Sequence, residues 1–334
     1  MIEFLWLKTA SILTRERNGD QLKKRTNRAI AFALAAILLV GGTQISSSAY
    51  EPTEEKNSLV QTERITQEHN VEGARVLGLH SIANKSVYYY KRLPISYEGK
   101  KGTASALLIG EEYYVSLRTV SDLVGTAYSY NSSTRTATVT ANGLKMTATA
   151  GNYTAYANDR PLFNRSPIVV MNDGRLYLPL STVTKAMGIR ADIGSGVSLS
   201  GTLNPLRHAS SFYRDDEVLW LARIIEAESG GESLLGQIAV GNVVLNRVKS
   251  KDFPNTIWGV IFDKKYGVQF SPVSNGTIYN TPSYNATLAA KICLEGFSLS
   301  EDILFFLEPR ISTSSWIPRT REYVFTIMHH DFYA

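Results

Sequence analysis

Cysteine is almost absent from this sequence, because Cys293 is the only one among 334 residues. No internal disulfide can form, and the chain offers neither a cysteine cluster for a metal ion nor a redox pair. The sequence therefore predicts that Cys293 is a buried apolar thiol.

Histidine is also scarce, with 5 residues in the whole chain. Residues 215–334 contain only the adjacent pair His329-His330, whose side chains diverge. A zinc site needs three or four ligands in a fixed geometry. We expect no metal ion and no cofactor, and we expect His330 to be structural or to contact substrate.

An excess of one charge sign is missing once the amino-terminal segment is set aside. The chain has 35 Lys and Arg residues against 30 Asp and Glu residues, a formal net charge of +5. Residues 1–49 hold 7 of the basic and 3 of the acidic residues, which leaves 28 against 27. A nearly neutral chain lacks the basic surface that nucleic acid requires, so no nucleic-acid partner is expected.

Long apolar runs are missing apart from one near the amino terminus. Four basic residues between Lys23 and Arg28 precede the apolar run 29–40, and small residues follow up to Ala49. This order is typical of a secretory signal cleaved after Ala49. The run is shorter than the ~20 residues of a spanning helix, although extension to Ile45 leaves an uncleaved anchor open. In both cases we expect a secreted or extracytoplasmic protein, with membrane attachment only through residues 1–49.

Residues 50–92 are polar and weakly patterned, which predicts a linker, with Tyr88 to Tyr90 marking the first strand of the next domain. That domain, residues 93–200, contains one pattern twice. "YYVSLRTVSDLVG" (113–125) and "LYLPLSTVTKAMG" (176–188) both predict a strand, a short helix and a glycine stop. A hairpin is predicted around Asn142-Gly143. The domain is expected to be α+β.

The repeat resembles the copper amine oxidase N-terminal domain, through the stretches Ser116-Leu117-Arg118 with Gly125 and Pro179-Leu180-Ser181 with Gly188. Residues 93–200 contain no His and no Cys, so the family name does not imply copper here. We expect a positioning or wall-binding role.

A second polar linker, residues 201–214, leads into residues 215–334. Apolar residues at helical spacing predict a helix that is capped by Asp215 or Asp216 and broken by Gly230-Gly231, and a second helix with a small-residue face follows. Glu228 falls in the last turn of the first helix, beside an apolar neighbour. Burial and the helix dipole both predict a raised pKa there, which suits a general acid.

Two nearby carboxylates have different predicted environments. Glu232 opens the second helix, where the dipole favours its ionised form. It is a second catalytic candidate, unless Arg247 pairs with it and removes it from chemistry. Glu226 points to another face and is expected to be solvated.

Residues 216–334 resemble the SleB-type cell wall hydrolases, the spore cortex-lytic enzyme family, through "LARIIEAESGGESLLGQIAVGNVVLNRV" and the later pieces "FPNTIWGVIF", "QFSPVSNG", "ILFFLEP" and "TIMHHDFY". The resemblance implies a mainly helical domain like lysozyme or lytic transglycosylases, with Glu228 as the catalytic acid. It also implies substrate-binding positions at Gln269, Phe270, Ser271, Phe305, Phe306, Trp316, His330 and Tyr333. The other two tryptophans of residues 216–334, Trp220 and Trp258, are predicted to lie in the core.

The implied function is cleavage of peptidoglycan glycan strands at the β-1,4 bond between N-acetylmuramic acid and N-acetylglucosamine. A single acid fits internal attack by the muramic 6-hydroxyl, as in lytic transglycosylases. Hydrolysis helped by Glu232 stays open. Two alternatives remain: a wall- or spore-binding adapter that cuts no bond, and a muramoyl-alanine amidase, which would need more zinc ligands than this domain offers.

Overall fold

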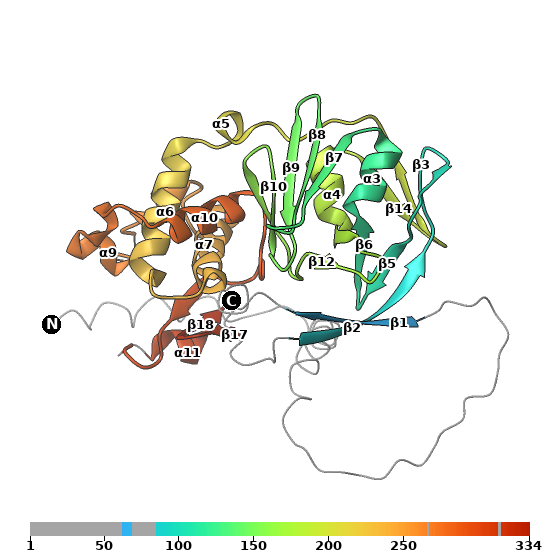
Figure 1. Cartoon of the computed structure of the whole chain (residues 1–334). Coiled ribbons are helices and arrows are strands. Elements are labelled where there is room, and N and C mark those ends of the chain that lie inside the picture. The colour runs from blue at the N-terminus through green and yellow to red at the C-terminus, as the bar shows by residue number, and fades with distance from the viewer. Residues whose placement is uncertain (1–61, 69–84, 266, 313–314) are drawn as a thin grey trace, which may run out of the picture. The chain divides into compact units, whose positions relative to one another are not determined.

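The computed structural model describes residues 62–68, 85–265, 267–312 and 315–334 (Figure 1), and all of them lie in one compact unit, Leu59–Ala334. The predicted export segment, residues 1–49, lies outside the described residues. Within the described ranges, no helix combines the length and the apolar character needed to cross a bilayer.

The two sequence repeats form the predicted strand, helix and glycine stop. Strand β6 (Glu112–Ser116) leads into helix α3 (Leu117–Val124), and β13 (Leu176–Pro179) leads into α4 (Leu180–Met187). Each helix ends at a glycine in the left-handed region, Gly125 at φ 81° and Gly188 at φ 65°, where a side chain would be strained. The prediction for this unit is confirmed.

The repeats meet in the middle of a six-stranded sheet, where β6 and β13 pair antiparallel with Leu178 opposite Val115. The strand order is β1-β2-β5-β6-β13-β12, in which the other strands are β1 (Thr62–Glu68), β2 (Lys85–Leu93), β5 (Ala106–Ile109) and β12 (Val169–Val170). Strand β1 and most of β2 lie inside the range predicted as a linker, and β2 contains Tyr88 to Tyr90, which were predicted to mark the first strand. Part of residues 50–92 therefore belongs to this sheet.

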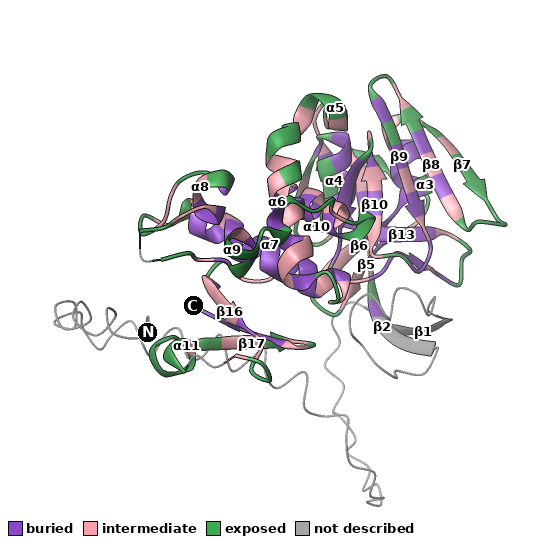
Figure 2. Cartoon of the chain, turned by 90° about the vertical axis from the view of Figure 1, so that its left-hand side faces the viewer, coloured by how far each residue is buried: buried purple, intermediate pink, exposed green. Residues whose placement is uncertain are grey.

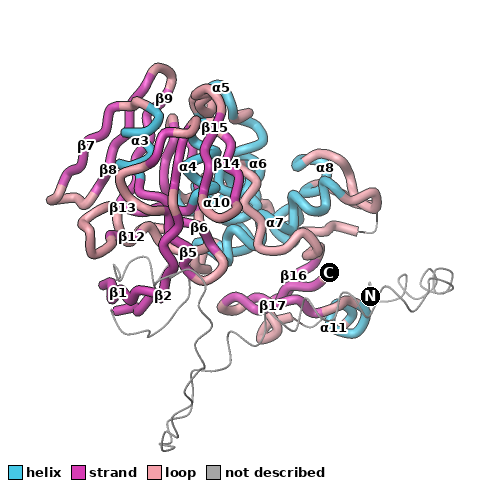
Figure 3. Tube along the Cα trace, turned by 90° about the vertical axis from the view of Figure 1, so that its right-hand side faces the viewer, coloured by secondary structure: helices cyan, strands magenta, loops and turns pink. Residues whose placement is uncertain are grey.

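Two further sheets complete the repeat domain (Figure 3). One has the order β11-β10-β9-β8-β7 and contains β7 (Ala127–Asn131), β8 (Thr136–Ala141), β9 (Leu144–Thr149), β10 (Thr154–Ala157) and β11 (Arg160–Phe163). The other has the order β14-β15-β3-β4 and contains β3 (Ile95–Tyr97), β4 (Lys100–Lys101), β14 (Arg190–Ile193) and β15 (Val197–Ser200). The predicted hairpin is present between β8 and β9, with Gly143 at φ 72°.

The second domain is mainly helical, and its largest helices are α6 (Asp215–Ser229), α7 (Leu234–Lys249) and α10 (Tyr284–Leu294). Their facing sides are buried (Figure 2). A Cβ on Gly241 of α7 would lie 2.7 Å from Sγ of Cys293 and 2.9 Å from Cδ1 of Ile225. The predicted small-residue face therefore permits close helix packing, and Cys293 is buried as expected.

Smaller elements surround this helical core. They are α8 (Ile257–Ile261), α9 (Ser271–Asn275), η1 (Thr277–Tyr279), α11 (Trp316–Thr320) and a three-stranded sheet of order β16-β18-β17, formed by β16 (Phe305–Leu307), β17 (Tyr323–Ile327) and β18 (His330–Tyr333). The α+β fold class, with a repeat domain followed by a mainly helical domain, is confirmed.

Two local predictions need correction. The N-cap of α6 is Arg214, and its side chain makes no capping bond, so neither Asp215 nor Asp216 is the cap. Both carboxylates lie in the first turn, where the helix dipole favours negative charge. The predicted linker 201–214 contains helix α5 (Ala209–Phe212) and is bonded to the repeat domain, because the side-chain amide of Asn158 donates to the carbonyl of Leu206 at 2.6 Å.

Candidate active site

Glu228 lies on the buried side of α6. Ile224 and Leu221, one and two turns earlier on the same side of the helix, are fully buried, as is Ile225. The 3.6-residue period carries the Glu228 side chain onto the face that these residues form. The helix ends one residue later, and Gly230 is its C-cap.

Burial raises the pKa of Glu228 from 4.5 to about 7, although the positive charge of Arg247 opposes this rise. Removal from water penalises the carboxylate form, so the proton is retained near neutrality. This confirms the direction predicted from the sequence. A carboxyl with such a pKa can donate a proton at neutral pH and then accept one.

Arg247, on α7, is the charged group that acts on Glu228, and its side chain is almost fully buried. Its Nε donates to the carbonyl of Leu304 at 2.8 Å. The guanidinium lies over three aromatic rings, at 4.9 Å from the centroid of Phe253, 5.1 Å from Phe270 and 5.4 Å from Phe305. Burial lowers the pKa of Arg247 to about 10, with Asp263 and Glu228 opposing this fall.

Glu232 occupies a different environment from the predicted one. It precedes the N-cap Ser233 rather than standing in the first turn of α7. Its Oε1 lies 2.8 Å from Nδ1 of His329 and 3.6 Å from Nδ1 of His330. Among the described contacts, Arg247 does not pair with Glu232 and instead donates to a backbone carbonyl, so the suggested pairing is wrong. The carboxylate joins the start of α7 to the β17–β18 turn.

The predicted substrate residues fall into two groups. Around Arg247, Phe270 is buried, Gln269 donates to the carbonyl of Gly267 at 3.1 Å, and Ser271 is exposed at the start of α9. Phe305 contacts the partly exposed Trp316, with ring centroids 5.8 Å apart.

The second group lies on the small sheet. Phe306 contacts the His330 ring with centroids 5.5 Å apart, and Tyr333 is buried. Burial lowers the pKa of His330, with Glu232 opposing this fall. His330 is thus packed beside Glu232.

Two expectations about neighbouring side chains are wrong. Glu226 is not simply solvated, because its Oε2 accepts hydrogen bonds from the backbone N–H and the hydroxyl of Ser283, the N-cap of α10. Trp258 is not in the core, because 56% of it is exposed. Trp220 packs partly buried against the core.

Two contacts were not predicted from the sequence. His329 is the partner of Glu232, and the charge of Arg247 acts on the pKa of Glu228. The motif positions carried a signal for Arg247, since an arginine inside an apolar helix needs a partner. No local pattern could have paired His329 with a residue 97 positions away.

The repeat domain and the helical domain are joined by a buried ion pair. Arg160, on β11, donates from Nε and a terminal nitrogen to Glu295 at 2.7 and 2.9 Å, and the hydroxyl of Tyr213 donates to the same carboxylate at 2.6 Å. Burial alone would raise the pKa of Glu295, but these hydrogen bonds and the charges of Lys185 and Arg160 hold it below its ordinary value. The charges are therefore paired rather than isolated.

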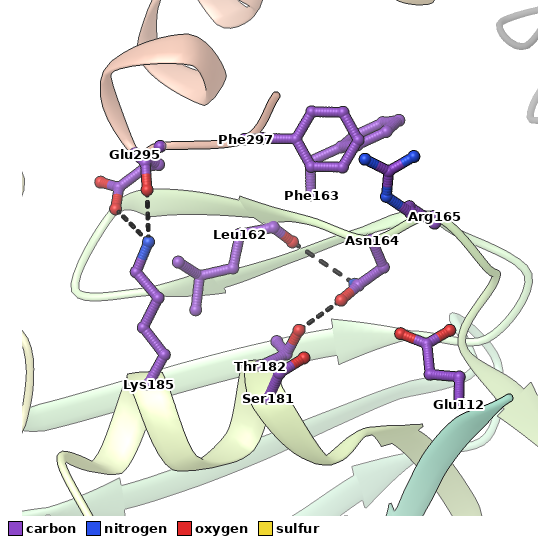
Figure 4. Close-up of a pocket in the computed structure, with 11 residues that line it drawn as sticks. Glu112, Leu162, Phe163, Asn164, Arg165, Ser181, Thr182, Lys185, Glu295 and Phe297 are labelled. Atoms are coloured by element: carbon purple, nitrogen blue, oxygen red, sulfur yellow. Dashed lines mark hydrogen bonds and ion pairs between the residues drawn. The ribbon is translucent and has the colours of Figure 1, made fainter. Parts of the chain in front are cut away.

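A cavity of about 270 Å³ lies along this junction (Figure 4), lined by Glu112, Leu162, Phe163, Asn164, Arg165, Ser181, Thr182, Lys185, Glu295, Gly296 and Phe297. Many of its polar groups are bonded to one another or to the backbone. Thr182 donates to Asn164, Lys185 pairs with Glu295, and Arg165 donates to the carbonyl of Ser298. Glu228 is not among the lining residues, so this cavity belongs to the junction between the domains.

The fold and the site together define a class: a helical domain that holds one carboxyl of raised pKa beside a buried arginine and aromatic rings. Residues 231–333 match the family Cell Wall Hydrolase, and residues 97–196 match the Copper amine oxidase N-terminal domain. The first match begins three residues after Glu228.

Individual curated relatives support the match to the family Cell Wall Hydrolase. A spore cortex-lytic enzyme of Bacillus cereus is 38% identical over 120 residues, which cover 36% of this chain and 45% of that protein. One of Bacillus subtilis is 35% identical over 105 residues, covering 31% of this chain and 33% of that protein. The chain thus spans less than half the length of these curated relatives.

The solved catalytic domain of the germination-specific lytic transglycosylase SleB from Bacillus anthracis is 37% identical, and the match covers 36% of this chain and 97% of that domain, with a TM-score of 0.34. The carboxyl-terminal domain of this chain is thus similar in sequence to the SleB-type cell wall hydrolases.

Proposed function

We propose that this protein is an exported enzyme that cleaves peptidoglycan glycan strands at the β-1,4 bond between N-acetylmuramic acid and N-acetylglucosamine. The observation that carries the proposal is the partly buried carboxyl of Glu228 on the apolar face of α6, whose pKa is raised to about 7. The match of residues 231–333 to the family Cell Wall Hydrolase supports the substrate class. Spore cortex is the proposed form of the wall, in line with the names of the relatives from Bacillus cereus and Bacillus subtilis.

Glu228 protonates the leaving glycosidic oxygen as positive charge develops on the sugar ring. The carboxylate that remains then accepts a proton from the attacking hydroxyl. The nearby charge of Arg247 stabilises this carboxylate, since unlike charges attract strongly in a site that excludes water.

Internal attack by the muramic 6-hydroxyl is the favoured second step, because it needs no second catalytic carboxylate. The alternative is hydrolysis, in which Glu232 helps to activate water. Glu232 is held by His329 at 2.8 Å and only 6% of its side chain is exposed, which restricts its access to a water nucleophile. Its proposed role is to position the start of α7.

The remaining proposed substrate contacts are Gln269, Phe270, Ser271, Phe306, Trp316, His330 and Tyr333. Trp316 is the most exposed of the aromatic residues in this set, at 40%, and an exposed ring can stack on the apolar face of a sugar. Phe270 and Tyr333 are buried, so their proposed role is to support the substrate-binding side chains by packing.

The test is digestion of purified spore cortex and vegetative wall by the full chain, followed by mass spectrometry of the products. Products with 1,6-anhydro ends support internal attack, whereas reducing ends alone would replace it with hydrolysis. Glu228→Gln keeps the size of the side chain and removes the proton, so we expect cleavage to fall at least a hundredfold.

Glu226→Gln is the matched control, because Glu226 lies two residues away on the same helix and bonds Ser283 instead. This variant should cleave at close to the parent rate. If Glu228→Gln remains folded and cleaves as fast as the parent, Glu228 is not the acid. If the parent protein itself binds wall without cutting it, the protein is an adapter and not an enzyme.

A further inference from the structure

Four aromatic side chains of the helical domain form a continuous row on α6, α8 and η1. The indole of Trp258 is stacked on Phe262, with centroids 4.9 Å apart and an interplanar angle of 28°. Phe262 contacts Trp220 edge to face at 5.2 Å, and Trp220 contacts Tyr279 in the same manner at 6.2 Å. We call these four residues the aromatic row.

The inner members of the row are anchored and the outer members are open. Trp220 and Phe262 pack against the core of the helical domain. The guanidinium of Arg223 covers one face of Trp220 at 4.9 Å from the ring centroid. Trp258 and Tyr279 are 56% and 60% exposed. The row therefore presents two fixed, open rings to the solvent.

The sequence neighbours of the open rings include amide and hydroxyl side chains. Asn255 and Thr256, beside Trp258, and Asn280, beside Tyr279, are all exposed. Amide and hydroxyl groups both donate and accept hydrogen bonds. Aromatic rings with such neighbours match a sugar, whose ring has an apolar C–H face and a rim of hydroxyl groups.

The row also shares a helix with the candidate acid. Trp220 precedes Glu228 by eight residues on α6, which separates them by about 12 Å along the helix axis. A glycan strand held at the acid has to continue in one direction or the other beyond the sugars that react. A strand that continues toward the amino-terminal end of α6 would approach Trp220 and the rest of the row.

We propose that the aromatic row is a glycan-binding platform, in which Trp258 and Tyr279 stack on pyranose rings of the strand away from the bond that is cut. This inference rests on the proposed glycan substrate. The two open rings can stack on the apolar faces of pyranose rings while the neighbouring amide and hydroxyl side chains bond the sugar hydroxyl groups. A sugar strand is therefore the occupant that fits.

The experiment measures binding of the full chain to purified, insoluble peptidoglycan in the Glu228→Gln background, so that binding is read without digestion. Trp258→Leu and Tyr279→Leu remove the aromatic faces but keep apolar side chains. Each is expected to weaken binding roughly three- to tenfold. Trp258→Phe keeps a ring and should retain most of the affinity.

The matched control is Tyr284→Leu, which removes an exposed ring, 74% accessible, from the start of α10 and should leave binding unchanged. When Glu228 is intact, the Trp258→Leu protein should cleave soluble tetrasaccharide fragments at the parent rate. It should cleave insoluble wall more slowly than the parent. This result separates loss of the platform from failure of the proposed chemistry, because cleavage by the parent protein tests the chemistry without any change in the row.

Parent-like binding by Trp258→Leu and Tyr279→Leu would overturn the proposal, as would an equal loss in Tyr284→Leu. If Trp258→Leu instead converts a dimeric parent into a monomer, as seen by light scattering, the row binds a second copy of the chain and the glycan platform is refuted.

Discussion

Replacing Glu228 by Gln should change the stability of the protein in a way that depends on pH. The folded-state pKa of Glu228 is about 7, against an ordinary value of 4.5. Below pH 4.5 the side chain is protonated in both the folded and the unfolded states, so the parent has no ionisation penalty. As the pH rises from 4.5 through 7, only the unfolded state releases the proton easily, and the parent loses stability.

The size of this effect follows from the difference between the two pKa values. A pKa difference of one corresponds to about 1.4 kcal/mol, so the full loss of stability is about 3 kcal/mol above pH 7. Gln has a similar shape and cannot ionise. The Glu228→Gln variant should therefore gain stability relative to the parent across this pH range.

The assay is urea unfolding of the full chain at intervals between pH 4 and pH 8.5, with Glu226→Gln as the control for removal of a nearby carboxylate. The difference between Glu228→Gln and the parent should grow with pH and level off above 7. A difference that is constant with pH would refute the reasoning, because it would mean that Glu228 ionises equally easily in the folded and unfolded states.

Three other predictions concern residues around this site and the domain junction. Arg247→Met removes the positive charge that lowers the pKa of Glu228, so the alkaline fall in the pH–rate profile of wall cleavage should move upward; an unchanged profile would show that this charge does not act on the acid. Glu295→Ala leaves the buried Arg160 guanidinium without its carboxylate and should lower the free energy of unfolding in urea by about 3–5 kcal/mol. Glu301→Ala, at an exposed position, should lower it little. Equal losses in the two variants would contradict a junction that depends on this ion pair. Gly241→Ala places a Cβ 2.7 Å from Sγ of Cys293 and should lower the free energy of unfolding in urea by about 1–3 kcal/mol. Adding Cys293→Ala to this variant should restore part of the lost stability. A Gly241→Ala variant with parent stability would refute the close packing.

Local structure in this chain follows from local sequence. The alternation of strand residues, the helical spacing and the closing glycines of the two repeats are read within a dozen positions, and the structure has the same units at β6–α3 and β13–α4. The raised pKa of Glu228 was predictable for the same reason. Its position relative to Ile224 and Leu221 places it on the apolar face of the helix, whatever the rest of the chain does.

Contacts between distant segments required the tertiary structure. The sequence does not reveal that Glu232 lies 2.8 Å from His329, or that Arg160 meets Glu295 at a separation of 135 positions. Composition also favoured a core position for Trp258, which is instead 56% exposed. By itself, the sequence determined the two strand–helix repeats and the helix on which the acid lies, because periodicity acts over a few residues. Only the fold decided which charges are paired and which rings are open to solvent, because those depend on how the finished elements pack.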